Sequence, residues 1–110
     1  MKVNELAQKL DMKILSGKES LQKEVTNVYI CDLLSWVMSH AEKGNAWITI
    51  HTHLNIVAVA LLTEVSCIII PENISVEENT IKKAEEEDIA ILSSPLSAYE
   101  LCYRMHELLA

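Results

Sequence analysis

Short apolar runs alternate along the chain with longer segments in which apolar residues recur every three or four positions. We expect the four apolar runs to form buried strands, at residues 28–30, 46–50, 67–70 and 89–92. Each run is followed by one to three small or polar residues and then by an apolar segment, the first of which covers residues 33–40. Apolar spacings of three and four predict helices because they place those side chains on one face.

This order of strands and helices indicates an α/β fold. Strands that are apolar throughout have no solvated face, and helices of about a dozen residues between them suit right-handed crossovers. We therefore expect a small, mostly parallel sheet with helices on both faces, a three-layer α/β/α fold formed by one domain over residues 1–110. An amphipathic helix at 3–10, a short strand at 12–15 and a polar, flexible loop at 16–20 precede the repeated units.

Two helix starts carry capping signals. Ser75 stands three residues before Glu78, the spacing of a capping box, and Ser94 precedes Pro95, a pair typical of an N-cap and a first helical residue. We therefore expect helices at 76–87 and 95–109. Trp36 and Trp47 are expected to anchor the core or an interface. One side of the last helix is also expected to pack in the core, and it carries Leu96, Tyr99, Cys102, Tyr103, His106 and Leu109.

The segment 54–65 has almost no polar face, because most of its residues are leucine, isoleucine, valine or alanine. A helix that is apolar all round has to be covered all round. In so small a domain, we expect part of this helix to pack against a second subunit, so that the protein forms a homodimer.

Composition and charge exclude several classes of function. A formal net charge of -7 argues against nucleic acid and anionic membrane surfaces as partners. The longest mainly apolar run, 54–62, is far shorter than the roughly 20 residues of a membrane span, so we expect a cytoplasmic protein. Cys31, Cys67 and Cys102 are odd in number and lie in apolar surroundings, which favours buried thiols over disulfides.

Candidate chemistry gathers where the predicted strands end. In parallel α/β sheets, ligands bind at the carboxyl ends of the strands, where free N–H groups of helix starts can hold anions. We call this edge the crest and expect it to bind a ligand. Its candidate binding residues are Asp32, His51, Thr52, His53, Ser93 and Ser94.

Two other kinds of site remain as weaker alternatives. His51 and His53 could share a metal with Asp32, although no third ligand stands at a telling spacing. Cys31 could act as a nucleophile beside His51, although no orienting residue or oxyanion loop accompanies the pair. The chain has only two glycines and no phosphate-binding loop or dinucleotide fingerprint, so we expect neither an enzyme nor a bound cofactor.

Residues 24–35 and 47–60, together with 67–71 and 89–100, resemble a stand-alone DRTGG domain. Such domains are similar to the N-terminal, noncatalytic part of HPr kinase/phosphorylase, and they also occur in some phosphate acetyltransferases and in pyrophosphatases with CBS domains. The resemblance implies a regulatory module with an α/β fold that forms homodimers. At the namesake Asp-Arg-Thr-Gly-Gly signature this chain reads His51-Thr52-His53-Leu54-Asn55 instead, so no binding residue is carried over.

Together these features predict a noncatalytic regulatory or ligand-sensing domain. The predicted ligand is an adenine nucleotide or another phosphorylated metabolite, bound at the crest. The alternative is a protein-interaction subunit that docks on an enzyme or kinase through the apolar helix at 54–65.

Overall fold

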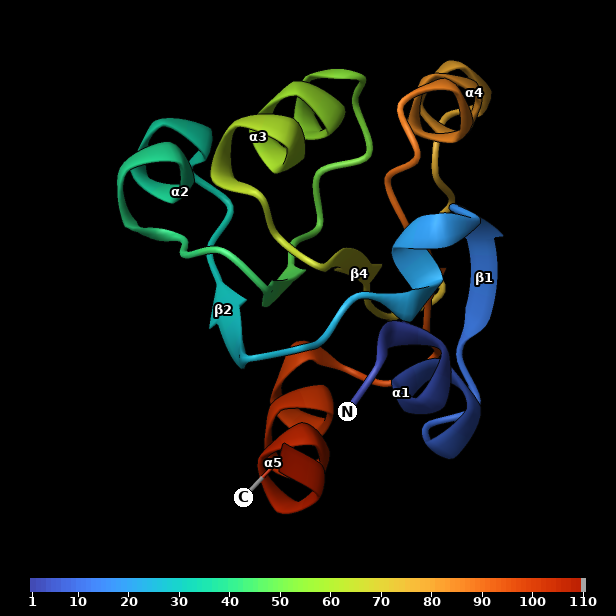
Figure 1. Ribbon diagram of the computed structural model, residues 1–110, viewed down its shortest axis with the longest axis vertical. Helices are drawn as coiled ribbons and strands as arrows, with labels where there is room; N and C mark the ends of the chain where they lie inside the picture. The colour runs from blue at the N-terminus through green and yellow to red at the C-terminus, as the bar shows by residue number, and fades with distance from the viewer. Residues whose placement is uncertain (110) are drawn as a thin grey trace.

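The computed structural model describes residues 1–109 and forms a five-stranded sheet between two layers of helices (Figure 1). The predicted three-layer α/β/α architecture is confirmed. In chain order the elements are α1 (Val3–Lys9), β1 (Lys13–Ser16), a 3-10 helix η1 (Glu19–Gln22), β2 (Asn27–Ile30), α2 (Leu34–His40), β3 (Asn45–Ile48), α3 (Asn55–Thr63), β4 (Cys67–Ile70), α4 (Glu78–Glu86), β5 (Ile91–Ser93) and α5 (Ala98–Leu109).

The strands lie in the order β1-β5-β4-β3-β2, so the sheet is mostly parallel, as predicted. β2, β3, β4 and β5 run parallel, whereas β1 pairs antiparallel with β5, with Lys13 opposite Ser93. The pairing of β1 is irregular between Ile14 and Ser16. Since the parallel strands share one direction, their carboxyl ends meet at one edge of the sheet and form the crest.

Alternate residues of the central strands supply two separate cores. Ala46 and Ile48 of β3 belong to the core under α1 and α5, and Trp47 between them belongs to the core under α2, α3 and α4. This division follows from the pleat, because successive side chains of a strand point to opposite faces. All four residues of β3 and all four of β4 are buried, as an apolar strand covered on both sides requires.

The predicted starts of the last two helices are wrong. α4 begins at Glu78 with Glu77 as its N-cap, so Ser75 does not cap it. α5 begins at Ala98, and the Oγ of Ser97 accepts a hydrogen bond from the N–H of Glu100 at 3.2 Å. The reason for the second shift is that the backbone just after β5 is still bonded to β4, since the N–H of Ser94 donates to the carbonyl of Ile70 at 3.0 Å.

The core assignment of the α5 side chains is confirmed only in part, because Leu96, Cys102 and Leu109 are partly buried against the core while Tyr99, Tyr103 and His106 are exposed. The buried residues of α5 are Leu101 and Met105, whereas Tyr99 is 78% exposed. Residues two apart on a helix point in different directions, so the predicted stripe is rotated away from the centre of the buried face and only its border contacts the core. Of the two tryptophans, Trp47 is fully buried and Trp36 is exposed. Within residues 1–109, no helix is long and apolar enough to cross a membrane.

The polar connection after β1 is held by the end of α4. One carboxylate oxygen of Asp88 accepts hydrogen bonds from the N–H of Lys18 at 2.8 Å and from the hydroxyl of Ser20 at 3.2 Å. A carboxylate oxygen of Glu85 accepts from the N–H of Gly17 at 2.8 Å. The backbone donor at Lys18 is the main cause that lowers the pKa of Asp88. This segment, expected to be a flexible loop, is thus tied to the C-terminal end of α4.

Substituting Asp88 with Asn keeps a residue that tolerates positive φ but removes the negative charge. We expect D88N to be less stable at neutral pH by about 1 kcal/mol, because hydrogen bonds to a charged acceptor are the stronger ones. The folded-state pKa lies below the reference value of 3.8. The contribution of the charge is therefore fully present above the unfolded-state pKa and is lost as pH falls through the folded-state pKa. Urea unfolding at neutral and acidic pH measures this difference.

Asp11 provides the matched control, because it has the same positive φ of 53° as Asp88 and is exposed. D11N should leave the free energy of unfolding unchanged. An equal loss in D11N and D88N, or a D88N loss that persists in acid, would contradict the role given to the Asp88 charge.

Candidate functional site at the carboxyl edge of the sheet

The six predicted binding residues all lie along the crest, but the strand order divides them into two groups. Asp32 follows β2, and His51, Thr52 and His53, which we call the histidine turn, follow β3, so these strand ends are neighbours. Ser93 ends β5 and Ser94 follows it, with β4 standing between them and β3. Strands two positions apart are separated by roughly 10 Å, so the serines lie a full strand away from the histidine turn.

Asp32 ties the end of β2 to the end of β3. One carboxylate oxygen accepts hydrogen bonds from the hydroxyl of Thr49 at 2.8 Å and from the N–H of Ile50 at 3.0 Å. In return, the Nε2 of His51 bonds the backbone carbonyl of Asp32. The hydroxyl of Thr49, which is buried, also accepts from the N–H of His51 at 3.3 Å. The carboxylate therefore has a structural role in shaping the turn.

The rest of the histidine turn is fixed from both ends. The Nδ1 of His53 accepts from the N–H of Asn55 at 3.1 Å, which gives α3 a side-chain partner at its first residue. The carbonyl of Thr52 accepts from the buried hydroxyl of Thr80 at 2.7 Å, so α4 holds the middle of the turn. Within this turn Thr52 is partly exposed and His53 is exposed.

The two serines differ in accessibility. Ser94 is fully buried, its carbonyl accepts from the N–H of Asn73 at 2.9 Å, and its hydroxyl oxygen accepts from the N–H of Leu96 at 3.1 Å. Ser93 is partly exposed. Of this pair, Ser93 is the one whose side chain is accessible to a ligand at the crest.

The thiol and imidazole of the weaker alternatives contact backbone groups. The thiol of Cys31 donates to the carbonyl of Leu33 at 3.8 Å, while the ring of His51 bonds the carbonyl of Asp32. Among residues 1–109, no group of three His, Cys, Asp or Glu side chains could hold a metal ion. The thiols are free, but only Cys67 is buried, and burial raises its pKa to about 12. Cys31 and Cys102 are half-buried, contrary to expectation.

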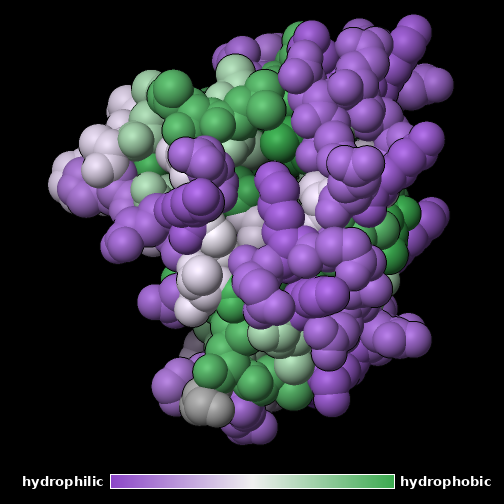
Figure 2. Space-filling model, in the orientation of Figure 1, coloured by the Kyte–Doolittle hydropathy of each residue, from purple (hydrophilic) through white to green (hydrophobic). Residues whose placement is uncertain are grey.

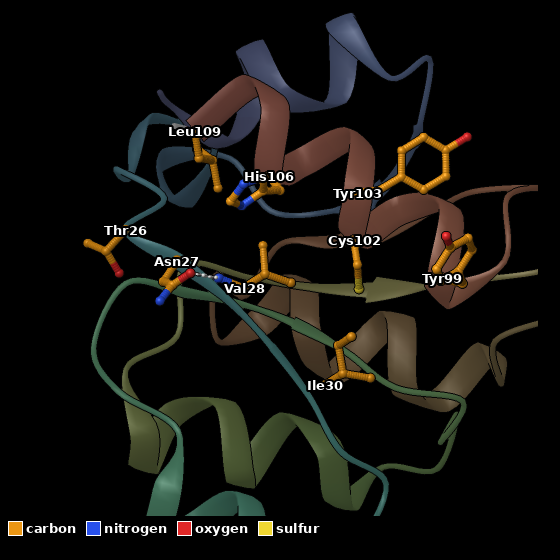
Figure 3. Close-up of a pocket in the computed structure, with 9 residues that line it drawn as sticks. All are labelled: Thr26, Asn27, Val28, Ile30, Tyr99, Cys102, Tyr103, His106 and Leu109. Atoms are coloured by element: carbon orange, nitrogen blue, oxygen red, sulfur yellow. Dashed lines mark hydrogen bonds between the residues drawn. The ribbon is translucent and has the colours of Figure 1, made fainter.

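A hollow of about 630 Å³ lies between β2 and α5 (Figure 3). We call it the β2–α5 groove. Its volume falls in the range of ligand-binding clefts. It is lined by Thr26, Asn27, Val28, Ile30, Tyr99, Cys102, Tyr103, His106 and Leu109. Sequence reasoning missed this groove because it assigned the α5 residues to the core. The available signal was the two tyrosines and a histidine on a single helical face.

The Asp32–Thr49 contact can be tested by a double-mutant cycle. We expect D32A to lower the free energy of unfolding by about 1–3 kcal/mol, because it leaves the buried Thr49 hydroxyl and the Ile50 N–H without their acceptor. T49V removes the hydroxyl, so the double variant should lose less stability than the sum of the two single losses. Urea unfolding measures all four proteins. Strictly additive losses would contradict the contact.

Comparisons with known proteins agree with this fold. The structure resembles a crystal structure of the CBS and DRTGG domains of the regulatory region of Clostridium perfringens pyrophosphatase, complexed with its activator diadenosine tetraphosphate. The TM-score is 0.73 at 14% sequence identity, and the match covers 91% of this chain but only 44% of the pyrophosphatase chain. No curated protein sequence matches the chain. The sequence matches the DRTGG domain over residues 5–108, and the chain therefore belongs to the DRTGG domain family.

Proposed function

We propose that this chain is a noncatalytic regulatory domain that senses an adenine nucleotide or another phosphorylated metabolite at the crest. The observation that carries the proposal is the match to the DRTGG domain over nearly the whole chain, together with its likeness to a regulatory region that was crystallised with a nucleotide activator. The crest contacts agree with a noncatalytic role, because Cys31 and His51 are both bonded to backbone carbonyls.

The histidine turn offers a physical means of sensing. It is the point where β2, β3 and α4 are joined, through the carboxylate of Asp32 and the hydroxyl of Thr80. A phosphate group that binds His53 and the hydroxyl of Thr52 would contact the turn directly and stabilise this joint. Binding would then rigidify the start of α3, whose first N–H is bonded by His53.

A second candidate function, docking on another protein, is favoured by the outer face of α3. Leu54, Ala58, Leu61 and Leu62 lie on one side of the helix segment and are all exposed, and Leu62 is 68% exposed. The opposite side, which includes Ile56 and Val59, is buried in the core. Figure 2 shows hydrophobic surface over the α2 and α3 side of the molecule, whereas the α4 side is mainly hydrophilic. We propose that this face pairs two copies as a homodimer, or docks on an enzyme or kinase.

The ligand proposal predicts a rise in the melting temperature of several degrees when AMP, ATP, diadenosine tetraphosphate or inorganic phosphate is added well above its dissociation constant. H53A should remove most of the rise, each protein being compared with its own ligand-free form. H40A is the matched control, since His40 is an exposed histidine on α2, away from the crest. No shift with any of these compounds, or a shift that H53A leaves intact, would contradict a crest site.

The docking proposal predicts a dimer by light scattering at micromolar concentration. L62E should give a monomer of unchanged stability, because it places a charge on an exposed apolar face without disturbing the core. I14E, which alters an exposed isoleucine of β1, should remain dimeric. If the parent protein is monomeric, the homodimer is wrong, and docking on a different protein is the form of the proposal that stays open.

A further inference from the structure

β2 has one open edge. It is the last strand of the sheet and pairs only with β3. In Figure 1 it stands at the margin of the molecule, with α2 on one side of the sheet and α5 on the other. An edge strand presents unpaired N–H and C=O groups, and these form a template on which another strand can be added.

The open backbone groups belong to Val28 and Ile30. The N–H of Thr49 donates to a carbonyl of β4 at 3.2 Å, so its neighbour Ile48 directs its backbone groups toward β2. Ile48 lies opposite Ile30 in the parallel pair. Because the backbone groups of Ile48 bond to β2, those of the residue opposite it, Ile30, point away from β3 and out of the sheet. Val28, two residues earlier, shares this direction, although its N–H is bonded by the side chain of Asn27 at 2.9 Å.

The two edges of the sheet differ in protection. The β1 edge carries a charged, exposed Lys13 and an irregular pairing between Ile14 and Ser16, and both features discourage strand addition. β2 reads Asn27-Val28-Tyr29-Ile30, with no charge, no proline and a regular register. The β1 edge therefore has a charged residue and an irregular pairing that discourage another strand from pairing, and the β2 edge has neither.

The β2–α5 groove lies beside this open edge. Side chains of an added strand would alternate between the two faces of the extended sheet, and those on the α5 side would enter the groove. Figure 3 shows Val28 and Cys102 facing the same space, with Ile30 and Tyr99 at one end and His106 toward the other. Ile30 is 48% exposed, and Tyr99 and Tyr103 form a tilted ring pair 5.5 Å apart. Exposed tyrosines and isoleucine beside an unpaired strand are typical of a peptide-binding surface.

We propose that the open edge of β2 and the β2–α5 groove bind an extended segment of another protein, which adds as a sixth strand beside β2. Its alternate residues are apolar, because no Lys, Arg, Asp or Glu lines the groove. Its flanks carry Lys or Arg, because this chain has a net charge of -7 and attracts basic segments. The β2 strand of a second copy is preceded by Val25 and Thr26 and followed by Cys31 and Asp32, so it lacks basic flanks and is the less favoured occupant.

The test uses the full chain, labelled for NMR, and a short synthetic peptide with a valine-threonine repeat between pairs of lysines. A peptide with the same ends and two central prolines is its control, because proline cannot donate to a strand ladder. We expect the repeat peptide to protect the amide of Ile30, to shift the signals of Val28 and Ile30 and to perturb Tyr99. I30K, which places a charge on the open edge, should weaken binding at least about tenfold. I14K changes an isoleucine of similar exposure on the opposite edge and should have no effect.

Three outcomes would overturn the proposal. The first is no perturbation at about 1 mM peptide, which would detect even a weak complex. The second is equal binding of the proline peptide, or equal weakening by I14K and I30K. The third is a dimer of the parent protein that I30K, but not L62E, converts to monomer, which would give the edge to a second copy. None of these outcomes depends on ligand binding at the crest, and the comparison of I30K with L62E separates the β2 edge from the α3 face, so the proposals fail separately.

Discussion

The central strands β3 and β4 are buried on both faces, and every helix is placed so as to keep them so. Trp47 and Ile68 point into one core, while Ile48 and Ile69 point into the other. Neither strand can leave one face to water without exposing several large apolar side chains, so helices have to pack on both sides. The crossovers that supply these helices also align the strands in parallel and bring their polar ends to one edge.

The ends of the parallel strands meet at that edge, and side-chain hydrogen bonds join them there in addition to the backbone hydrogen bonds of the sheet. Asp32 performs this role between β2 and β3, and Thr80 holds the histidine turn from α4. Trp47 adds a further tie, since its indole N–H donates to the carbonyl of Cys31 at 2.9 Å. Polar residues at this edge thus hold the turns together, and the exposed His53 also faces solvent while its Nδ1 accepts from the N–H of Asn55.

The two outer strands of the sheet, β1 and β2, contain exposed residues, unlike the buried central strands. A five-stranded sheet has two edges, and this one covers them unequally. At the β1 edge, the segment after the strand is bound to Asp88 and Glu85 at the end of α4. At the β2 edge, α5 packs against one face of the strand. Tyr99 and Tyr103 of α5 remain exposed beside this contact. The same helix therefore buries Leu101 and Met105 and leaves an aromatic face for contact with another molecule.

The sequence by itself determined the number, type and order of the repeated strands and helices, because an apolar run reports burial on both faces wherever the strand lies. It also indicated the crest residues, since strand ends follow directly from strand positions. Only the tertiary structure decided that Ser94 is buried while Ser93 is not, and that Asp32 meets Thr49, because these contacts depend on which strands are neighbours. For the same reason, the sequence did not reveal that the α5 stripe borders an open edge of β2. Helical spacing shows that residues share a face, whereas the packing of the whole chain decides what that face touches.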